Sequence, residues 1–220
     1  MYLIKTITIL LLCSAMAYSS LDMVENLNPK SIKGHSLTII FTSPVHVEIG
    51  YEIGKFPESD NPDSIFENSF INMLPRAIKK YSKFKDIKPI VNSDTKQFYS
   101  LEKIDNINYA FLNINDSINR KINSDYVIFF HRSSMLAFLD DYKSIKSNNP
   151  EDGPDTTFEN ITLLFHTAVT IWDVKHKFLI AKCTINSNEL IEIIPCDLKE
   201  FDEFVNEVIE ELFDDTPFEE

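Results

Sequence analysis

Residues 123–130 read Asn-Ser-Asp-Tyr-Val-Ile-Phe-Phe, and this stretch decides the fold class. Five consecutive apolar residues, Tyr126 to Phe130, follow a polar triplet that is typical of a turn. A strand that is apolar at every position belongs at the centre of a sheet, where both faces are covered. The stretch therefore predicts a central strand with other elements packed on each side of it.

Further strands are predicted before and after this central run. The segments rich in β-branched and aromatic residues are 37–41, 45–49, 87–91, 161–172 and 178–185. Pro44 cannot donate a ladder hydrogen bond, so we expect one bent strand or two short ones around it. The last two segments flank a turn at residues 173–177, which predicts an antiparallel β-hairpin.

Three other segments repeat apolar residues at intervals of three and four, the spacing of a helix with one buried face: 64–81, 104–118 and 198–213. Pro75 lies inside the first segment and predicts a kink or a break. Helices that each carry one apolar stripe need a sheet to cover. We therefore predict an α/β (α+β) fold, in which helices pack against a central mixed β-sheet and a C-terminal β-hairpin is followed by an amphipathic helix.

The amino-terminal seventeen residues, MYLIKTITILLLCSAMA, have the layout of a secretory signal peptide. Lys5 precedes an apolar run that is too short for a permanent membrane anchor, and the run ends in the cleavage pattern Ala15-Met16-Ala17. Cleavage after Ala17 is the favoured interpretation. Two alternatives stay open: lipidation of Cys13, although Leu12 before it is not small, and an uncleaved apolar segment.

This signal sets the predicted domain organisation and compartment. We expect a signal peptide at 1–17, a polar spacer at 18–36, a single α/β domain at 37–213 and an acidic tail at 214–220. The mature chain is expected to be exported, either periplasmic or extracellular. It would contact a membrane only through the signal segment or a lipid on Cys13.

Acidic residues are concentrated at the carboxyl end. The formal net charge is −13, and residues 200–220 hold ten acids and no base. Nucleic-acid binding is therefore not expected, because it usually requires a basic surface. The acidic end is predicted to be a solvated helix face and a frayed tail, and docking of a basic partner is the alternative.

No cofactor is expected, because the sequence lacks the motifs that hold one. There are four glycines, no phosphate-binding loop, and none of the common hydrolase signatures. After signal removal two cysteines remain, Cys183 and Cys196, which could close one disulfide. Alternatively, Cys183 is a small buried apolar residue within a strand. The two cysteines lack the histidine spacing of a zinc site, so no metal is expected.

The histidines are far apart in the sequence and show no ligand spacing. His131 and His166 fall in or beside predicted strands that could bring them together, and Asp173 directly follows the second of these strands. A site assembled from these three dispersed residues is the alternative in which the protein is an exported enzyme. The competing interpretation is that each is a hydrogen-bonded structural residue.

Three segments resemble a known group of domains: Ser124 to Ile128, Ala168 to Lys175 and Phe178 to Lys182. They are similar to a strand and a hairpin of bacterial envelope lipoprotein domains of the TolB amino-terminal, curli secretion lipoprotein and penicillin-binding-protein activator type. The resemblance covers the element order from Leu37 to Phe213 and implies a periplasmic, non-catalytic α/β domain that binds other envelope proteins. It assigns no functional residue, and His176-Lys177 stands where Thr-Gly is typical of the turn.

The sequence thus predicts an exported, non-catalytic binding or interaction domain of the cell envelope, whose partner is another envelope or extracellular protein. The exported enzyme around His131, His166 and Asp173 is the alternative. A third interpretation is a eukaryotic or viral secreted protein, in which Asn115 and Asn160 would accept glycans.

Overall fold

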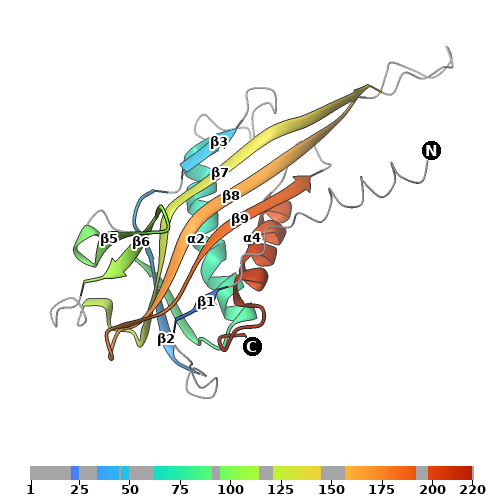
Figure 1. Ribbon diagram of the computed structural model, residues 1–220. Helices are drawn as coiled ribbons and strands as arrows, with labels where there is room; N and C mark the ends of the chain where they lie inside the picture. Colours follow the sequence, from blue (N-terminus) through green and yellow to red (C-terminus); the bar gives the residue numbers. More distant parts are fainter. Residues whose placement is uncertain are drawn as a thin grey trace, which may run out of the picture.

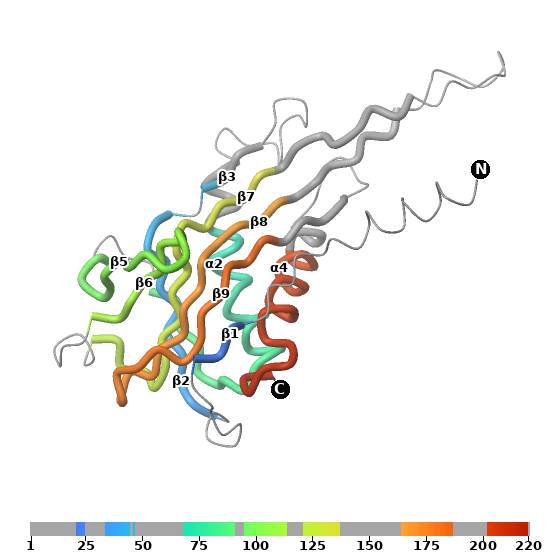
Figure 2. Tube along the Cα trace, in the orientation of Figure 1, coloured from blue at the N-terminus to red at the C-terminus, as the bar shows by residue number. Residues whose placement is uncertain are grey.

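A mixed β-sheet forms the centre of the molecule, and two helices lie behind it in the view of Figure 1. The computed structural model describes residues 21–24, 34–44, 46–49, 62–90, 95–113, 121–144, 157–191 and 198–219. Figure 2 traces the same chain in the same orientation. This mixed α+β architecture is the predicted fold class.

The sheet has seven strands, six of which follow one another in the order β1-β9-β8-β7-β2-β4. Their bounds are Asp22–Met23 for β1, Phe178–Ile191 for β9, Thr157–Asp173 for β8, Tyr126–Ser144 for β7, Ser36–Phe41 for β2 and Asp86–Ile90 for β4. The seventh, β3 (His46–Ile49), pairs with β7. Strands β1, β9, β8 and β7 pair antiparallel with one another in that order. Strands β2 and β3 each pair parallel with β7, and β4 pairs parallel with β2, so the sheet is mixed.

The run Tyr126–Phe130 begins β7 and is buried on both faces, as predicted. Ile128 and Phe130 face the core beneath the helices, whereas Val127 and Phe129 face a smaller core on the opposite side. All four side chains are 0% exposed. Because side chains alternate along a strand, a run that is apolar throughout supplies both cores at once.

Two helices cover one face of the sheet. They are α2 (Pro62–Tyr81) and α4 (Leu198–Phe213), and their apolar stripes enter the larger core. Helix α2 is continuous through Pro75, so the predicted break is absent. It begins at Pro62, before the predicted start, and proline is favoured in the first turn because that amide has no partner within the helix.

The predicted helix at 104–118 is wrong, because its described part is a β-hairpin. Strands β5 (Tyr99–Ile104) and β6 (Ile107–Leu112) pair antiparallel across a two-residue turn. Asp105 and Asn106 in this turn have φ values of 50° and 69°. Two successive positive φ angles match the twist of a tight hairpin, and Asp and Asn tolerate them better than other non-glycine residues. A short 3-10 helix, η3 (Thr95–Gln97), precedes the hairpin.

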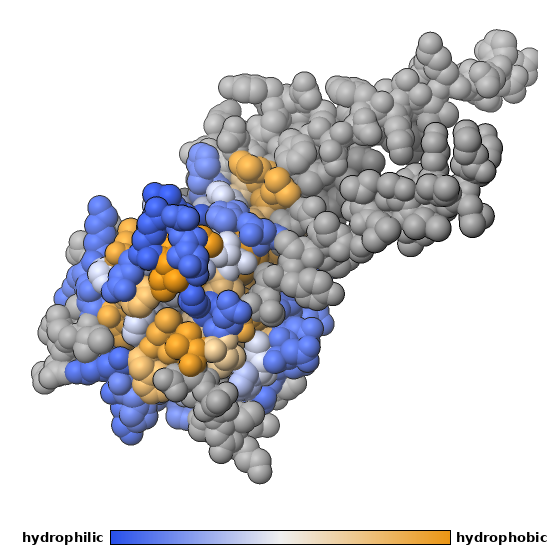
Figure 3. Space-filling model, viewed as in Figure 1, coloured by the Kyte–Doolittle hydropathy of each residue, from blue (hydrophilic) through white to orange (hydrophobic). Residues whose placement is uncertain are grey.

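The hairpin β5–β6 covers the face of the sheet that the helices leave open. Ala110 and Leu112 of β6 join Phe98 and Trp172 in the smaller core. In Figure 3, hydrophilic and hydrophobic residues are interspersed over this side of the molecule. Among the described residues, the large hydrophobic side chains that remain exposed are Val24 and Leu101, each 50% exposed.

Both ends of the described chain are tied to the body. Leu21, within the predicted polar spacer, is buried in the larger core beside β1. Phe218, within the predicted acidic tail, is 0% exposed and stacks on Phe84 with ring centroids 5.6 Å apart. Residues 214–219 are therefore docked and do not form the frayed end that their charge suggested. No described helix is long and apolar enough to cross a membrane.

Candidate functional site

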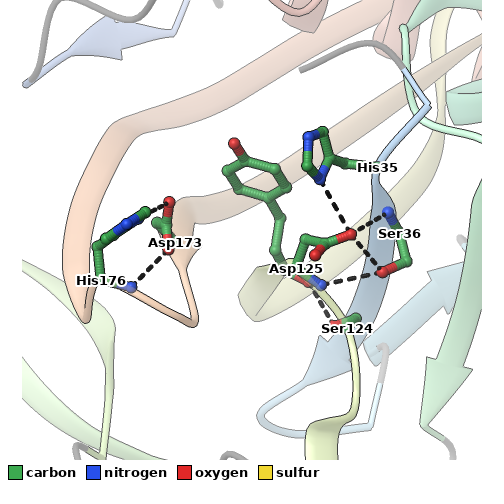
Figure 4. A network of polar contacts seen from close by, with 7 residues as sticks. His35, Ser36, Ser124, Asp125, Asp173 and His176 are labelled. Carbon is green, nitrogen blue, oxygen red and sulfur yellow. Dashed lines mark hydrogen bonds and ion pairs between the residues drawn. The ribbon is translucent and has the colours of Figure 1, made fainter. Parts of the chain in front are cut away.

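A network of polar groups lies where three strand ends meet. Strands β2 and β7 are parallel, so their amino ends lie side by side, and Ser36 and Asp125 stand at those ends. Strand β8, which pairs antiparallel with β7, ends with Asp173 at this same end of the sheet. Figure 4 shows these groups together with two histidines, His35 and His176. The topology thus assembles residues that are far apart in the sequence.

Asp125 is the centre of the first part of this network. Its Oδ2 accepts hydrogen bonds from the Ser36 N–H at 2.9 Å and from the Ser36 hydroxyl at 2.8 Å, and it lies 3.1 Å from His35 Nδ1. The Asp125 N–H in turn donates to Ser36 Oγ at 3.0 Å. The backbone N–H of Ser36, followed by the other donors, lowers the pKa of the Asp125 carboxyl.

Asp173 and His176 form the second part, at the turn between β8 and β9. Asp173 Oδ1 accepts a hydrogen bond from the His176 N–H at 2.7 Å, and Asp173 Oδ2 lies 2.9 Å from His176 Nδ1. Asp173 is 7% exposed, whereas His176 is mostly open to solvent. The carboxylate therefore closes the turn by binding the backbone three residues later.

Tyr126 links the two parts electrostatically. Its ring meets the His35 ring edge-on, with centroids 5.6 Å apart. Burial raises the pKa of the Tyr126 phenol, and the negative charges of Asp173 and Asp125 raise it further. The phenol is therefore neutral at physiological pH.

A shallow hollow of about 400 Å³ opens beside this network. Its lining residues are Ser36, Asn123, Ser124, Asp125, Val174 and Lys175. The two carboxylates of the region are already hydrogen bonded within the protein. What the hollow offers a partner is therefore a polar surface with one lysine, Lys175.

Ser36, His35 and Asp125 have the composition of a catalytic triad but not its connectivity. In a triad the histidine lies between the other two residues and takes the serine proton. Here Ser36 donates its hydroxyl proton to Asp125, and His35 binds the same carboxylate oxygen. The imidazole therefore does not activate the serine, and this arrangement holds β2 against β7.

His131, one of the predicted site residues, is a buried structural residue. It is 5% exposed, and its Nδ1 lies 2.6 Å from the Thr42 hydroxyl at the end of β2. Its Nε2 is buried without a hydrogen-bond partner. Burial lowers the pKa of His131, and the positive charge of Arg132 lowers it further. Arg132 has a φ of 53° in an irregularity of the β7–β8 ladder.

The three residues of the enzyme alternative do not converge. His166 is opposite Ser134 in the β7–β8 ladder, close to His131, but it is exposed and its Nδ1 contacts Asn186. Asp173 is seven residues further along β8, which places it about 23 Å from His166 at the usual rise of a strand. A single site cannot contain all three groups.

The predicted processing and disulfide residues are only partly described. Cys183 is 4% exposed in the larger core, where burial and then the charge of Asp22 raise the pKa of its thiol. Cys196 lies outside the described residues, so its pairing with Cys183 stays a prediction. Cys13, Ala15 and Ala17 also lie outside the described part of the chain.

Sequence reasoning missed His35, Ser36, Asp125 and His176 as members of one network. The available signal was the position of polar residues immediately before two apolar strands. If those strands are parallel and adjacent, their leading residues meet, but the pairing itself is not visible in the sequence. The Asp173-to-His176 contact is local and follows the usual chemistry of aspartate in turns.

A second hollow, of about 230 Å³, lies between the carboxyl ends of α2 and α4. It is lined by Lys80, Tyr81, Glu210, Glu211, Asp214 and Glu219. Tyr81 accepts a hydrogen bond from the Lys80 ammonium at 2.6 Å. This hydrogen bond raises the pKa of Lys80. Within the described ranges, no three histidine, cysteine or carboxylate side chains are arranged to hold a metal.

No family model and no curated protein matches the sequence. Among solved structures, the chain is similar to a neuraminyllactose-binding hemagglutinin homolog from Helicobacter pylori, at 12% identity, covering 81% of this chain and 79% of that one, with a TM-score of 0.36. It is also similar to the PelC dodecamer from Paraburkholderia phytofirmans, at 9% identity over 87% and 94% of the two chains, TM-score 0.36. A DUF330 protein from Xanthomonas campestris has 10% identity over 90% and 84%, TM-score 0.29.

All three neighbours are bacterial proteins. Their TM-scores are too low to establish a shared fold, and their identities are too low to assign a role to any residue here. None of the three is of the TolB amino-terminal type, so that resemblance stays a prediction.

Proposed function

We propose that this chain is an exported, non-catalytic interaction domain of the cell envelope. One observation carries the non-catalytic part: the Asp125 carboxylate binds both Ser36 and His35 through the same oxygen, which leaves the serine without a base. Ser36, His35 and Asp125 instead hold the ends of β2 and β7 together. The enzyme alternative has no support from geometry, since His131 and Asp173 lie far apart along the sheet.

The amino-terminal sequence supports export. A lysine, a short apolar run and the Ala15-Met16-Ala17 ending are what signal peptidase substrates require. Intact-mass measurement and amino-terminal sequencing of the native protein test this part. A chain that begins at Tyr18, or at an acylated Cys13, supports export, and an intact Met1 contradicts it.

The absence of catalysis is tested with a fluorophosphonate probe, which reacts with serine hydroxyls that a neighbouring base activates. We expect no labelling of Ser36 in the folded protein, because its hydroxyl is hydrogen bonded to Asp125 and not to an imidazole. Labelling of Ser36 that is lost in His35→Ala would contradict the proposal.

The interaction role is tested by cross-linking in the native cell envelope, followed by identification of the linked peptides. We expect recurrent cross-links from surface lysines of this chain, such as Lys175 beside the polar hollow, to one envelope or extracellular protein. A chain that yields only internal cross-links in its native setting would argue against an interaction domain.

A further inference from the structure

Strand β9 has an edge that the described strands leave largely unpaired. On one side it pairs with β8 from Phe178 to Ile191. On the other side β1 pairs only with Ala181 and Lys182, and the Val24 N–H donates to the Ile180 carbonyl at 2.7 Å. Between Cys183 and Ile191, no described strand lies on that side.

The unpaired stretch directs backbone groups away from the sheet. Because the Ile180 carbonyl binds β1, alternation along the strand points the backbone groups of Thr184, Asn186 and Asn188 to the same side. Such a row of N–H and C=O groups is a template for another extended segment. It lies next in line after the residues that pair with β1, and Leu21, the residue before β1, packs into the larger core.

The opposite edge of the sheet, strand β4, is protected against pairing with another chain, and the β9 edge is not. Edge strand β4 reads Asp-Ile-Lys-Pro-Ile, in which Pro89 cannot donate a hydrogen bond and Asp86 and Lys88 are exposed charges. Proline, lysine and short length are the usual protections of an edge strand. The stretch Cys183–Ile191 contains no proline and no lysine, and its one charged residue is Glu189.

Helix α4 makes the surroundings of this edge acidic. It packs against the helix-bearing face of the sheet, where it contacts β9 and its Phe204 meets Phe165 of β8, and in Figure 1 part of it is visible past the β9 edge. Two of its acids are turned to α2: Asp202 lies 3.8 Å from Arg76, and Glu210 acts electrostatically on Lys80. Glu203 and Glu207 are also exposed, although Glu203 already has a polar or electrostatic contact within the chain, and residues 200–220 contain no base.

We propose that the β9 edge binds an extended basic segment of a partner protein by strand addition. The partner's backbone would pair with Thr184, Asn186 and Asn188, and its lysine or arginine side chains would lie over α4 near Glu203 and Glu207. Backbone pairing supplies affinity in this mode, and alternate side chains supply specificity. The inference rests on the interaction role proposed above and names the chemistry of the partner.

A second copy of this chain is a poor occupant of the same edge. Pairing β9 with β9 across a twofold axis would bring two acidic α4 helices towards each other, and like charges at an interface are repulsive. A basic segment reverses that interaction. Charge complementarity therefore selects a heterologous partner.

The test uses the full processed chain and a labelled octapeptide of alternating lysine and threonine, with the glutamate–threonine octapeptide as its control. We expect the basic peptide to bind and to slow amide hydrogen exchange at Thr184, Asn186 and Asn188. Binding should weaken as salt is raised, because exposed charges are screened. The acidic peptide should not bind.

Two variants and one matched control distinguish peptide binding at the β9 edge from nonspecific attraction of a basic peptide to an acidic protein. Glu203→Gln combined with Glu207→Gln should weaken peptide binding about two- to thirtyfold, the range for two exposed ion pairs. Asp86→Asn with Glu102→Gln removes the same charge from β4 and β5 and should leave binding unchanged. Asn188→Pro removes one outward N–H and should abolish protection at the edge.

Several outcomes overturn the proposal. These are equal binding of both peptides, an equal effect of the control pair, and protection that maps away from β9. Two other occupants of the edge would also overturn it. A second copy of the chain would give a dimer with slowed amide hydrogen exchange at β9. This chain's own residues before Leu21 would slow exchange at β9 without peptide, and removing these residues would abolish that protection. Any of these results leaves the wider interaction role intact if envelope cross-links persist.

Discussion

Replacing Asp125 by alanine is expected to loosen the junction between β2 and β7. The carboxylate has three close polar contacts, with the Ser36 N–H, the Ser36 hydroxyl and His35 Nδ1. A hydrogen bond within a folded protein contributes about 1 kcal/mol net. Because the Asp125 side chain is 51% exposed, water compensates part of the loss, and we expect the total to be about 1.5 kcal/mol.

The assay is urea unfolding of the purified chain, followed by thermal unfolding. For a domain of this size, a loss of about 1.5 kcal/mol corresponds to a fall in Tm of about 3–6 °C. Asp125→Asn should cost less than Asp125→Ala, since the amide oxygen still accepts from the Ser36 N–H. Asp214→Asn is the matched control, because Asp214 is exposed and not part of this network.

The pH dependence gives a second, independent readout. The folded protein lowers the pKa of Asp125, so its contribution is fully present above the unfolded pKa of about 3.9. The contribution is lost as pH falls through the lower folded pKa. The difference between wild type and Asp125→Asn should therefore be constant near neutrality and shrink only in acid. A difference equal to that of Asp214→Asn, or one that grows in acid, would refute the reasoning.

Three further predictions concern the core and the hairpin. Asn106→Gly should stabilise the β5–β6 turn by about 0.5 kcal/mol, and Asn106→Val should destabilise it by about 1–2 kcal/mol, because Asn106 has a φ of 69°; thermal unfolding measures both. Cys183 should resist alkylation in the folded chain, since it is 4% exposed and burial raises the pKa of its thiol; mass spectrometry after unfolding without reductant then shows whether it pairs with Cys196. His131→Asn should keep a side-chain contact with Thr42 but remove a titrating group. Burial lowers the pKa of His131 in the folded state, so wild type should lose stability relative to this variant as pH falls below about 6.5; equal pH profiles would contradict this.

The central strand was predictable because its signal is local. Tyr126 to Phe130 are apolar at every position, and a strand covered on both faces is the structure that buries all of them. The apolar stripe of α4 is a signal of the same kind. In both cases the residues that specify the element are consecutive or one turn apart, so no knowledge of distant contacts is needed.

The hairpin at 99–112 shows where local periodicity fails. Ile104, Ile107 and Phe111 have helical spacing, yet Ile104 and Ile107 face each other across a two-residue turn. Spacings of three and four arise in a hairpin as well, because the turn resets the alternation of the second strand. The informative signal was the pair Asp105-Asn106, since these residues accept positive φ angles.

The polar network could not be predicted, because it depends on strand order. Ser36 and Asp125 are 89 residues apart and meet only because β2 pairs in parallel with β7. Nothing in either strand specifies that neighbour. The proposed docking edge depends on strand order in the same way, since β9 is near the border of the sheet only because β8 occupies its other side.

Connectivity, more than composition, decides what the network at the strand ends can do. A serine and a histidine both contact one aspartate, and these three residue types are the set found in a nucleophilic hydrolase. Catalysis requires the histidine to stand between the other two, because only then can it accept the serine proton. Here one aspartate oxygen serves both partners, so the serine proton is directed to a carboxylate of lowered pKa, which is a weak base. The same three residues therefore hold two strands together.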